Sequence, residues 1–194
     1  MSSNSRIQLE DWIKEIRLPA LSKVLDIGGS QLPINKRLGY KGEGSEFTIL
    51  DLETPHICKQ EPDIVMDLNE RWRPSLEREK FDIAFALEIS EYLWNPVLAL
   101  QNISFFLKQG GILYISFHFV YPAHNPPEED VMRYTPLGVY KLLEKAGFDI
   151  VEETPRIAEN PQLLSAFYSS EGMRPSKIWT KHNQVGSFFK AMKI

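Results

Sequence analysis

The chain has 194 residues, 43% of them hydrophobic and 25% charged, which is an ordinary composition for a soluble globular domain. A formal net charge of -4 argues against a nucleic-acid scaffold built on a basic patch, so no nucleic-acid partner is expected. The single cysteine excludes an internal disulfide and a cysteine-based metal cluster, and the lack of a long apolar run or signal-peptide core predicts a cytoplasmic chain without a membrane span.

The first half of the chain predicts one helix followed by four strands. Apolar residues at Leu9, Trp12, Ile13 and Ile16 recur at helical spacing, and they predict a helix from Leu9 to Arg17 within an N-terminal segment of residues 1–20. Short apolar runs separated by turn residues predict the strands. These runs cover residues 24–27, 47–51, 63–67 and 81–87.

The second half continues the alternation of strands and helices. A helix is expected at 98–107, closed by Lys108-Gln-Gly-Gly111, and a second at 136–146, closed by Gly147. The remaining apolar runs predict strands at 112–117, 149–153 and 187–194, with an insertion at 159–185 that contains a short helix at 162–168. This pattern predicts one α/β domain over residues 1–194, built on an open and mostly parallel sheet.

Acidic residues stand at or near the end of each of the first four strands. The run Lys23-Val-Leu-Asp26-Ile-Gly-Gly-Ser30 reads as a buried strand followed by a glycine turn, and the later strands run into Asp51, Asp67 and Glu88. A single strand-terminal Asp is more often a cap or a turn residue, but a carboxylate there can also accept both hydroxyl hydrogens of a ribose. Four in succession predict a site for a nucleotide-like cofactor.

The order and spacing of these motifs from about Val24 to Phe148 resemble the class I S-adenosylmethionine-dependent methyltransferases. The most specific segments are Phe81-Asp-Ile-Ala-Phe-Ala-Leu-Glu-Ile-Ser-Glu-Tyr92 and Leu107-Lys-Gln-Gly-Gly111, which are similar to the family's strand with Glu-x-x-Glu-His and to its Leu-Lys-x-Gly-Gly. Tyr92 stands where the family has His. The resemblance implies a Rossmann-like seven-stranded sheet with helices on both faces and an antiparallel last strand. It also implies S-adenosyl-L-methionine as cofactor.

The resemblance implies roles for the residues of the glycine turn. Gly28, Gly29 and Ser30 would approach the methionine part of the cofactor, and Asp26 would shape the turn. The family's loop usually reads Gly-x-Gly-x-Gly, whereas this chain has Ser30 and Leu32 at the second and third glycine positions. The turn is therefore the place where the resemblance is weakest.

The other cofactor residues follow the later strands. The resemblance implies that Asp51 holds the ribose hydroxyls and that Leu52 lies against adenine. Asp67 would accept a hydrogen bond from the adenine amino group, and the N–H of Leu68 would meet a ring nitrogen. The segment Ala86 to Glu88 would line the sulfonium side of the cofactor.

The long loop after the strand at 112–117 carries the candidate catalytic groups. Its His124-x-x-Pro-x-x-Asp-x-x-Arg-Tyr-Thr135 resembles a subgroup associated with methylation of glycans and small molecules, which implies such an acceptor, with a hydroxyl expected. A hydroxyl must lose a proton, which a neutral imidazole accepts at pH 7, so His118 and His124 are the candidate bases. Tyr121, Asp130 and Arg133 are candidate substrate-binding residues: Asp130 to orient a histidine, Arg133 to bind an anionic group. Alternatively, Asp130 and Arg133 pair with each other and only hold the loop.

Two other functions compete with methyl transfer. A dinucleotide-dependent oxidoreductase needs Gly-x-Gly-x-x-Gly opening a full helix, which this chain lacks. A non-catalytic binding or regulatory domain that retains the methyltransferase fold is favoured by the altered glycine loop and by the missing His beside Glu91. No metal site is predicted, because His56 and Cys58 have no partners at suitable spacing.

Overall fold

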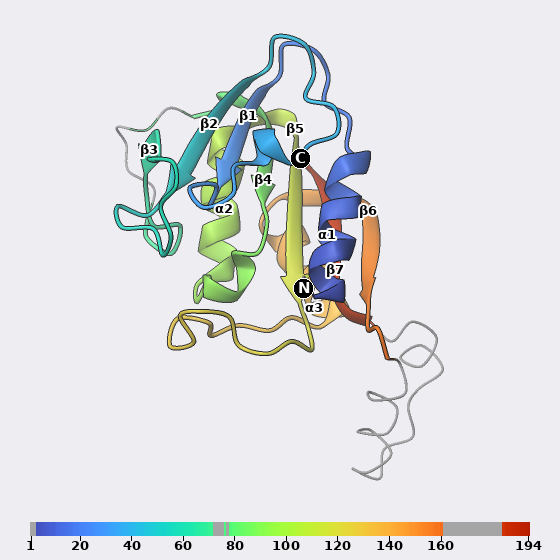
Figure 1. Ribbon diagram of the computed structural model, residues 1–194. Coiled ribbons are helices and arrows are strands. Elements are labelled where there is room, and N and C mark those ends of the chain that lie inside the picture. Colours follow the sequence, from blue (N-terminus) through green and yellow to red (C-terminus); the bar gives the residue numbers. More distant parts are fainter. Residues whose placement is uncertain (1–2, 72–75, 77, 161–183) are drawn as a thin grey trace.

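The computed structural model describes residues 3–71, 76, 78–160 and 184–194. Its centre is a seven-stranded sheet with the strand order β3-β2-β1-β4-β5-β7-β6 (Figure 1). The strands are β1 (Lys23–Ile27), β2 (Glu46–Asp51), β3 (Ile64–Val65), β4 (Phe81–Ala86), β5 (Leu107–His118), β6 (Phe148–Ile157) and β7 (Gln184–Lys193). The helix expected at 162–168 lies outside the described residues.

The pairing of the strands confirms the predicted sheet. Strands β3, β2, β1, β4 and β5 are parallel, and β7 is inserted antiparallel between β5 and β6. The strand order reverses between β1 and β4, which lie side by side but are separated along the chain by β2 and β3. Open α/β sheets bind ligands at the carboxyl ends of the strands beside such a reversal, so the fold itself marks the turn after β1.

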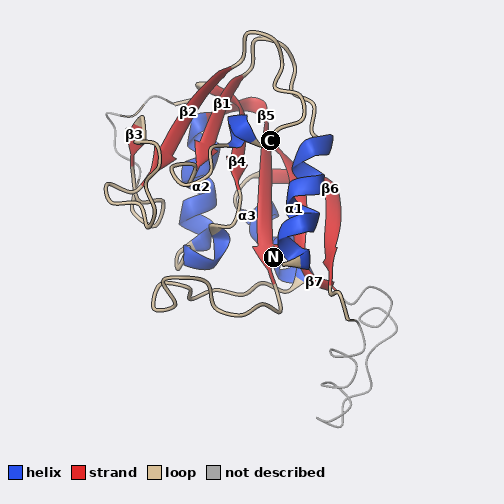
Figure 2. Cartoon of the chain, in the orientation of Figure 1, coloured by secondary structure: helices blue, strands red, loops and turns tan. Residues whose placement is uncertain are grey.

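The helices cover both faces of the sheet, with α1 on one face and α2 and α3 on the other (Figure 2). Helix α1 (Asn4–Glu15) starts at Ser3, whose hydroxyl accepts a hydrogen bond from the N–H of Arg6, and buries Leu9 and Ile13. Helix α2 (Pro96–Phe106) and helix α3 (Pro136–Lys145) bury their apolar faces against the opposite side of the sheet. The buried apolar residues therefore form two hydrophobic cores, one between α1 and the sheet and one between the sheet and helices α2 and α3.

Several elements differ in extent from the sequence-based expectation. Strand β6 runs from Phe148 to Ile157 rather than over 149–153, and β7 begins at Gln184 rather than at residue 187. Helix α1 begins at Asn4 rather than Leu9, because its cap lies at Ser3. Strand β3 has only two residues. Strand β5 includes the segment expected as a turn: Leu107 already pairs with Phe81, and the register shifts before Ile112 resumes pairing with Ile83. Gly110, at φ 73°, accommodates this irregularity.

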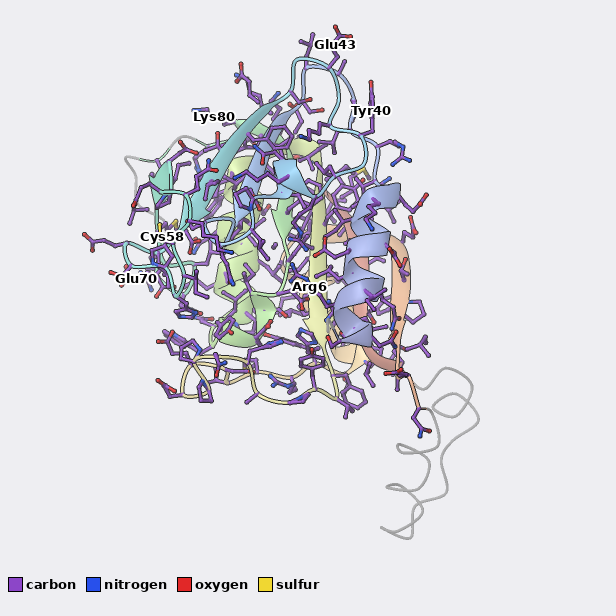
Figure 3. The ribbon with its side chains drawn as sticks, in the orientation of Figure 1. Arg6, Tyr40, Glu43, Cys58, Glu70 and Lys80 are labelled. Atoms are coloured by element: carbon purple, nitrogen blue, oxygen red, sulfur yellow. The ribbon has the colours of Figure 1, made fainter. Side chains whose placement is uncertain are left out.

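The loop of residues 119–135 runs beneath the carboxyl ends of β4 and β5 (Figure 1). The turn that carries Tyr40 and Glu43 lies at the opposite end of the sheet (Figure 3). Among the described residues, no helix has the length and apolar character required to cross a membrane.

Candidate active site

A cavity of about 1050 Å³ lies at the carboxyl ends of the first four strands. Its walls come from the turn after β1, the segments after β2, β3 and β4, and part of the loop 119–135. Of the residues expected from the sequence to bind a cofactor, six line it: Gly28, Asp51, Leu52, Asp67, Leu68 and Glu88. Asp26, Gly29, Ser30 and Ala86 lie behind its walls.

The turn after β1 requires its two glycines for different reasons. Gly28 has φ 74°, and a Cβ there would lie 2.6 Å from Cγ2 of Ile89. At Gly29 a Cβ would lie 2.3 Å from Oδ2 of Asp26. The absence of side chains at these positions lets the backbone approach the cavity on one side and the Asp26 carboxylate on the other.

Asp26 organises the turn from the buried side. Its Oδ2 accepts a hydrogen bond from the N–H of Ile34 at 2.6 Å, which fixes the chain after the turn. Burial raises the pKa of Asp26 to about 7, although the Ile34 N–H and the positive charge of Arg37 both favour ionisation. The placement fits the expectation that Asp26 shapes the turn.

Asp51 connects the turn to the end of β2 and presents its carboxylate to the cavity. Its Oδ2 accepts from the N–H of Ser30 at 3.2 Å, and its Oδ1 accepts from the N–H of Leu52 at 2.8 Å. Each carboxylate oxygen has a further lone pair, so the side chain can accept two more hydrogen bonds from a diol. Ser30 itself is fully buried, and its carbonyl accepts from the N–H groups of Lys59 and Gln60.

Glu88, directly after β4, is held in the cavity wall in an unusual conformation. Its φ of 57° is in the left-handed region, where non-glycine residues are uncommon. Its N–H donates to Oγ of Ser116 at 2.7 Å, and that hydroxyl donates to Oε1 of the same glutamate at 2.9 Å. The guanidinium of Arg156, completely buried on β6, also donates to Oε1.

His118 ends β5 behind Glu88 rather than in the cavity wall. Its side chain is 1% exposed, and Nη1 of Arg156 lies 2.9 Å from its Nδ1. Its Nε2 lies 3.3 Å from Oε2 of Glu88. Burial opposes ionisation of Glu88, but the hydrogen bond from His118 and the charge of Arg156 outweigh it and hold the pKa of that carboxyl well below its usual range.

His124 lies in the loop 119–135, and its partner is Glu91. The imidazole Nδ1 lies 2.6 Å from Oε1 of Glu91, whose side chain is 1% exposed, whereas that of His124 is 25% exposed. The close carboxylate of Glu91 raises the pKa of His124, although the partial burial of the ring acts in the opposite direction. The ring lies against Tyr121 and His118, with centroid distances of 4.8 and 4.9 Å.

Asp130 and Arg133 pair with each other, as the alternative reading of the loop expected. Both nitrogens of the guanidinium fork donate to the Asp130 carboxylate, Nη2 at 2.8 Å. The same side chain donates to the carbonyls of Tyr121, Pro122 and Met132. Asp130 also accepts from the backbone N–H of His124 at 2.5 Å. The pair therefore fixes the backbone that carries His124 and Tyr121.

Glu88, His118 and His124 offer ligand atoms within 4.8 Å of one another, a spacing that a metal ion could bridge. The surrounding charge opposes this. Nη1 of Arg156 contacts both ring nitrogens of His118, at 2.9 and 3.1 Å, and its guanidinium already neutralises Glu88. A metal ion would meet this buried positive charge, so the cluster favours a proton-binding network over metal binding.

Sequence reasoning did not assign Glu91 or Arg156 a role in the site. Glu91 had a local signal, since it follows Glu88 by three residues at the end of a strand. Arg156 had none, because it lies in a strand 68 residues from Glu88. Tyr92, at the position of the family's His, lines the cavity and donates its hydroxyl to the carbonyl of Asn125 at 3.0 Å.

Fold and site together define an α/β protein with a ligand cavity at the strand reversal. Solved structures with the same fold include a SAM-dependent methyltransferase from Aquifex aeolicus, with a TM-score of 0.60, 18% identity and 100% of both chains covered. They also include the [4+2]-cyclase SpnF, with a TM-score of 0.64, 16% identity, and 96% of this chain and 80% of SpnF covered. The protein therefore has the fold of the class I methyltransferases.

Comparisons of sequence agree with this fold. An uncharacterised protein of Mycobacterium tuberculosis is 30% identical over 132 residues, which are 61% of this chain and 43% of that protein. The ubiquinone biosynthesis O-methyltransferase of Histophilus somni is 26% identical over 104 residues, 48% of this chain and 44% of that enzyme. The chain thus spans less than half the length of these curated relatives. No family model matches it.

Proposed function

We propose that the protein is an S-adenosylmethionine-dependent methyltransferase acting on a small-molecule or carbohydrate acceptor, at a hydroxyl group. The observation that carries this proposal is the cavity wall itself. It combines a glycine turn that admits a ligand at the backbone with Asp51, Asp67 and Glu88 at the ends of three successive strands. A hydroxyl-methylating relative, the Histophilus somni enzyme, supports the choice of acceptor.

The residues present fit this cofactor and not a dinucleotide. Asp51 can accept from a ribose diol, and Leu52 and Leu68 offer apolar surface for adenine beside Asp67. The chain after the turn forms only a three-residue 3-10 helix, Ile34–Lys36, so the turn does not open a full helix that could hold a pyrophosphate at its N-terminus. When bound, S-adenosylmethionine supplies a methyl group on a sulfonium, which the acceptor oxygen takes while the C–S bonding pair returns to sulfur.

The protein's own contribution is alignment and removal of a proton. Alignment of two reactants supplies on the order of 7–11 kcal/mol of a barrier. His124 is the candidate base, because its side chain is 25% exposed and offers a ring nitrogen within 4.8 Å of the carboxylate of Glu88, which lines the cavity. His118, in contrast, is 1% exposed and enclosed by Arg156 and Glu88.

The charges in the cavity favour an uncharged acceptor. Among the described residues that line it there is no Lys or Arg, and Arg133 is committed to Asp130 and to three carbonyls. Five acidic residues line it: Asp51, Asp67, Glu88, Glu128 and Glu129. An anionic acceptor would be repelled, so neutral hydroxyl compounds are the first acceptors to assay.

A thermal-shift panel with S-adenosylmethionine, S-adenosylhomocysteine and NAD tests the proposal. At about 100 times its dissociation constant, a ligand adds about 2.7 kcal/mol of stability, which is roughly 5–11 °C for a chain of this size. We expect a shift with both adenosyl compounds and none with NAD. Asp51→Ala should abolish the shift and keep the fold, whereas Asp11→Ala, at an exposed position on α1, should keep both.

The absence of a shift with either adenosyl compound would overturn the proposal. Binding without turnover over a broad panel of hydroxyl acceptors would favour a non-catalytic domain that retains the cofactor. SpnF, whose name states a cyclase activity, shows that this fold is not restricted to methyl transfer.

A further inference from the structure

Three buried or partly buried carboxylates surround the two histidines of the site, and their partners differ. Glu88 is neutralised by Arg156, and Asp130 is neutralised by Arg133. Among the described residues, no arginine lies within ion-pair distance of Glu91: the groups that face its Oε1 are His124 Nδ1 at 2.6 Å and His118 Nε2 at 3.7 Å. A buried carboxylate without a compensating charge costs several kcal/mol, so a proton must be held at this position.

The ring of His118 is not free to hold that proton against Glu91. Nη1 of Arg156 lies 2.9 Å from Nδ1 of His118 and 3.1 Å from its Nε2, and an arginine N–H can only donate, so one ring nitrogen of His118 must accept from Arg156. Its Nε2 also lies 3.3 Å from Oε2 of Glu88. Among the described residues, no arginine contacts the ring of His124. Its Nε2 has no hydrogen-bond partner among the described residues, and Nδ1 is the atom that meets Glu91.

Several neighbouring groups fix the position of the His124 ring. Tyr121 and His118 lie against its faces and edge, and Asp130 holds its backbone N–H. The backbone carbonyl of Glu91 accepts from the N–H groups of Val131 and Met132, so the turn that carries Glu91 and the loop that carries His124 are bound together. These backbone hydrogen bonds therefore hold the side chains of Glu91 and His124 in contact.

We propose that Glu91 is the positioning residue of the base: it holds the proton of His124 on Nδ1 and so leaves Nε2 as the proton acceptor for the substrate hydroxyl. The proposal rests on the proposed function. In the reaction, the hydroxyl proton passes to Nε2 as the oxygen forms its bond to the methyl carbon. The imidazolium that results carries one positive charge, and the Glu91 carboxylate stabilises it in place.

The charged and titratable groups that face the ring set its pH dependence. They are Glu91 from the turn after β4, Glu88 from the end of β4, His118 from β5, and Tyr121 and Asp130 from its own loop. The carboxylates favour the imidazolium, so the pKa of His124 is raised above its usual value. Activity should therefore rise with pH as the ring loses its proton, and loss of one carboxylate should move that rise to lower pH.

Nitrogen-15 NMR of the histidine rings in Glu91→Gln tests the proposal without any acceptor, with the His124 signals identified from their loss in His124→Gln. In the wild type at high pH we expect the Nδ1–H form and a titration midpoint above that of a free imidazole. In Glu91→Gln, the Nδ1–H preference should be lost and the midpoint should fall. Glu153→Gln is the matched control, since that carboxylate is also hydrogen-bonded but lies on β6 beside Tyr140 and Ser187.

Turnover gives the second readout once an acceptor is found. Glu91→Gln should lower kcat by about 10²- to 10⁴-fold. Its affinity for S-adenosylhomocysteine should stay within about twofold of the wild type, and its pH–rate profile should shift to lower pH. An unchanged tautomer and midpoint in a folded Glu91→Gln protein would overturn the role of Glu91. Failure of the wild type to bind S-adenosylhomocysteine would instead overturn the proposed function, whatever the ring shows.

Discussion

The buried carboxyl of Asp26 shapes the turn of the site and also makes the stability of the fold depend on pH. Burial raises the pKa of its carboxyl from 3.8 to about 7. The unfolded chain releases this proton near pH 3.8, so the folded state binds the extra proton between the two values. The resulting stability is present below pH 3.8 and is lost as the pH rises to about 7, with a magnitude on the order of 4 kcal/mol.

Asp26→Asn should therefore stabilise the protein more at pH 8 than at pH 5. Its amide oxygen can still accept from the N–H of Ile34, and it removes the ionisation that burial opposes. Between those pH values we expect the advantage over the wild type to grow by about 3 kcal/mol, measured by urea denaturation. Asp149→Asn, at an exposed position, should show no such growth. An equal effect of Asp26→Asn at both pH values would contradict the assignment.

Elements far apart in the sequence meet at Arg156, which joins the end of β6 to Glu88 after β4 and to His118 at the end of β5. Loss of one partner of a buried ion pair leaves the other charge uncompensated and costs about 3–5 kcal/mol. Arg156→Met should show a loss of this size in urea denaturation, and Glu88→Gln in the same chain should restore part of it. Arg6→Met, which removes a partly exposed pair with Glu10, should cost less than about 1 kcal/mol.

Sequence patterns predicted those elements whose cause is local. The apolar runs gave every strand of the sheet, and the glycine turn with Asp51 and Asp67 gave one wall of the cavity, because strand ends and turn residues are neighbours in the chain. The extent of β5 was wrong, since its first residues depend on pairing with Phe81. The pairs His124–Glu91 and Arg156–Glu88 depend on how distant elements pack against each other, and the spacing of apolar residues along the chain does not predict such contacts.

In the whole molecule, the sheet brings segments from distant parts of the chain together around the cavity. They lie in the turn after β1, after β2, β3 and β4, and in the loop 119–135. The contacts that join that loop to the other walls include two made by side chains at the cavity itself. Nε2 of His56 lies 2.8 Å from Oε2 of Glu129, and the Tyr92 hydroxyl donates to the carbonyl of Asn125. A ligand in the cavity should therefore stabilise all of these segments at once.

Hydrogen exchange with and without S-adenosylhomocysteine measures this coupling. At about 100 times its dissociation constant, the ligand should slow exchange by about 100-fold wherever opening of the segment releases it. We expect this protection in segments 28–31, 51–57, 66–69, 88–94 and 125–131. The turn that carries Tyr40 and Glu43 lies at the opposite end of the sheet (Figure 3), so its exchange should not change.

Protection confined to 28–31 and 51–57, with 125–131 unaffected, would show that the loop 119–135 is not a wall of the cofactor site. In that case His124 would have to act on a ligand bound elsewhere.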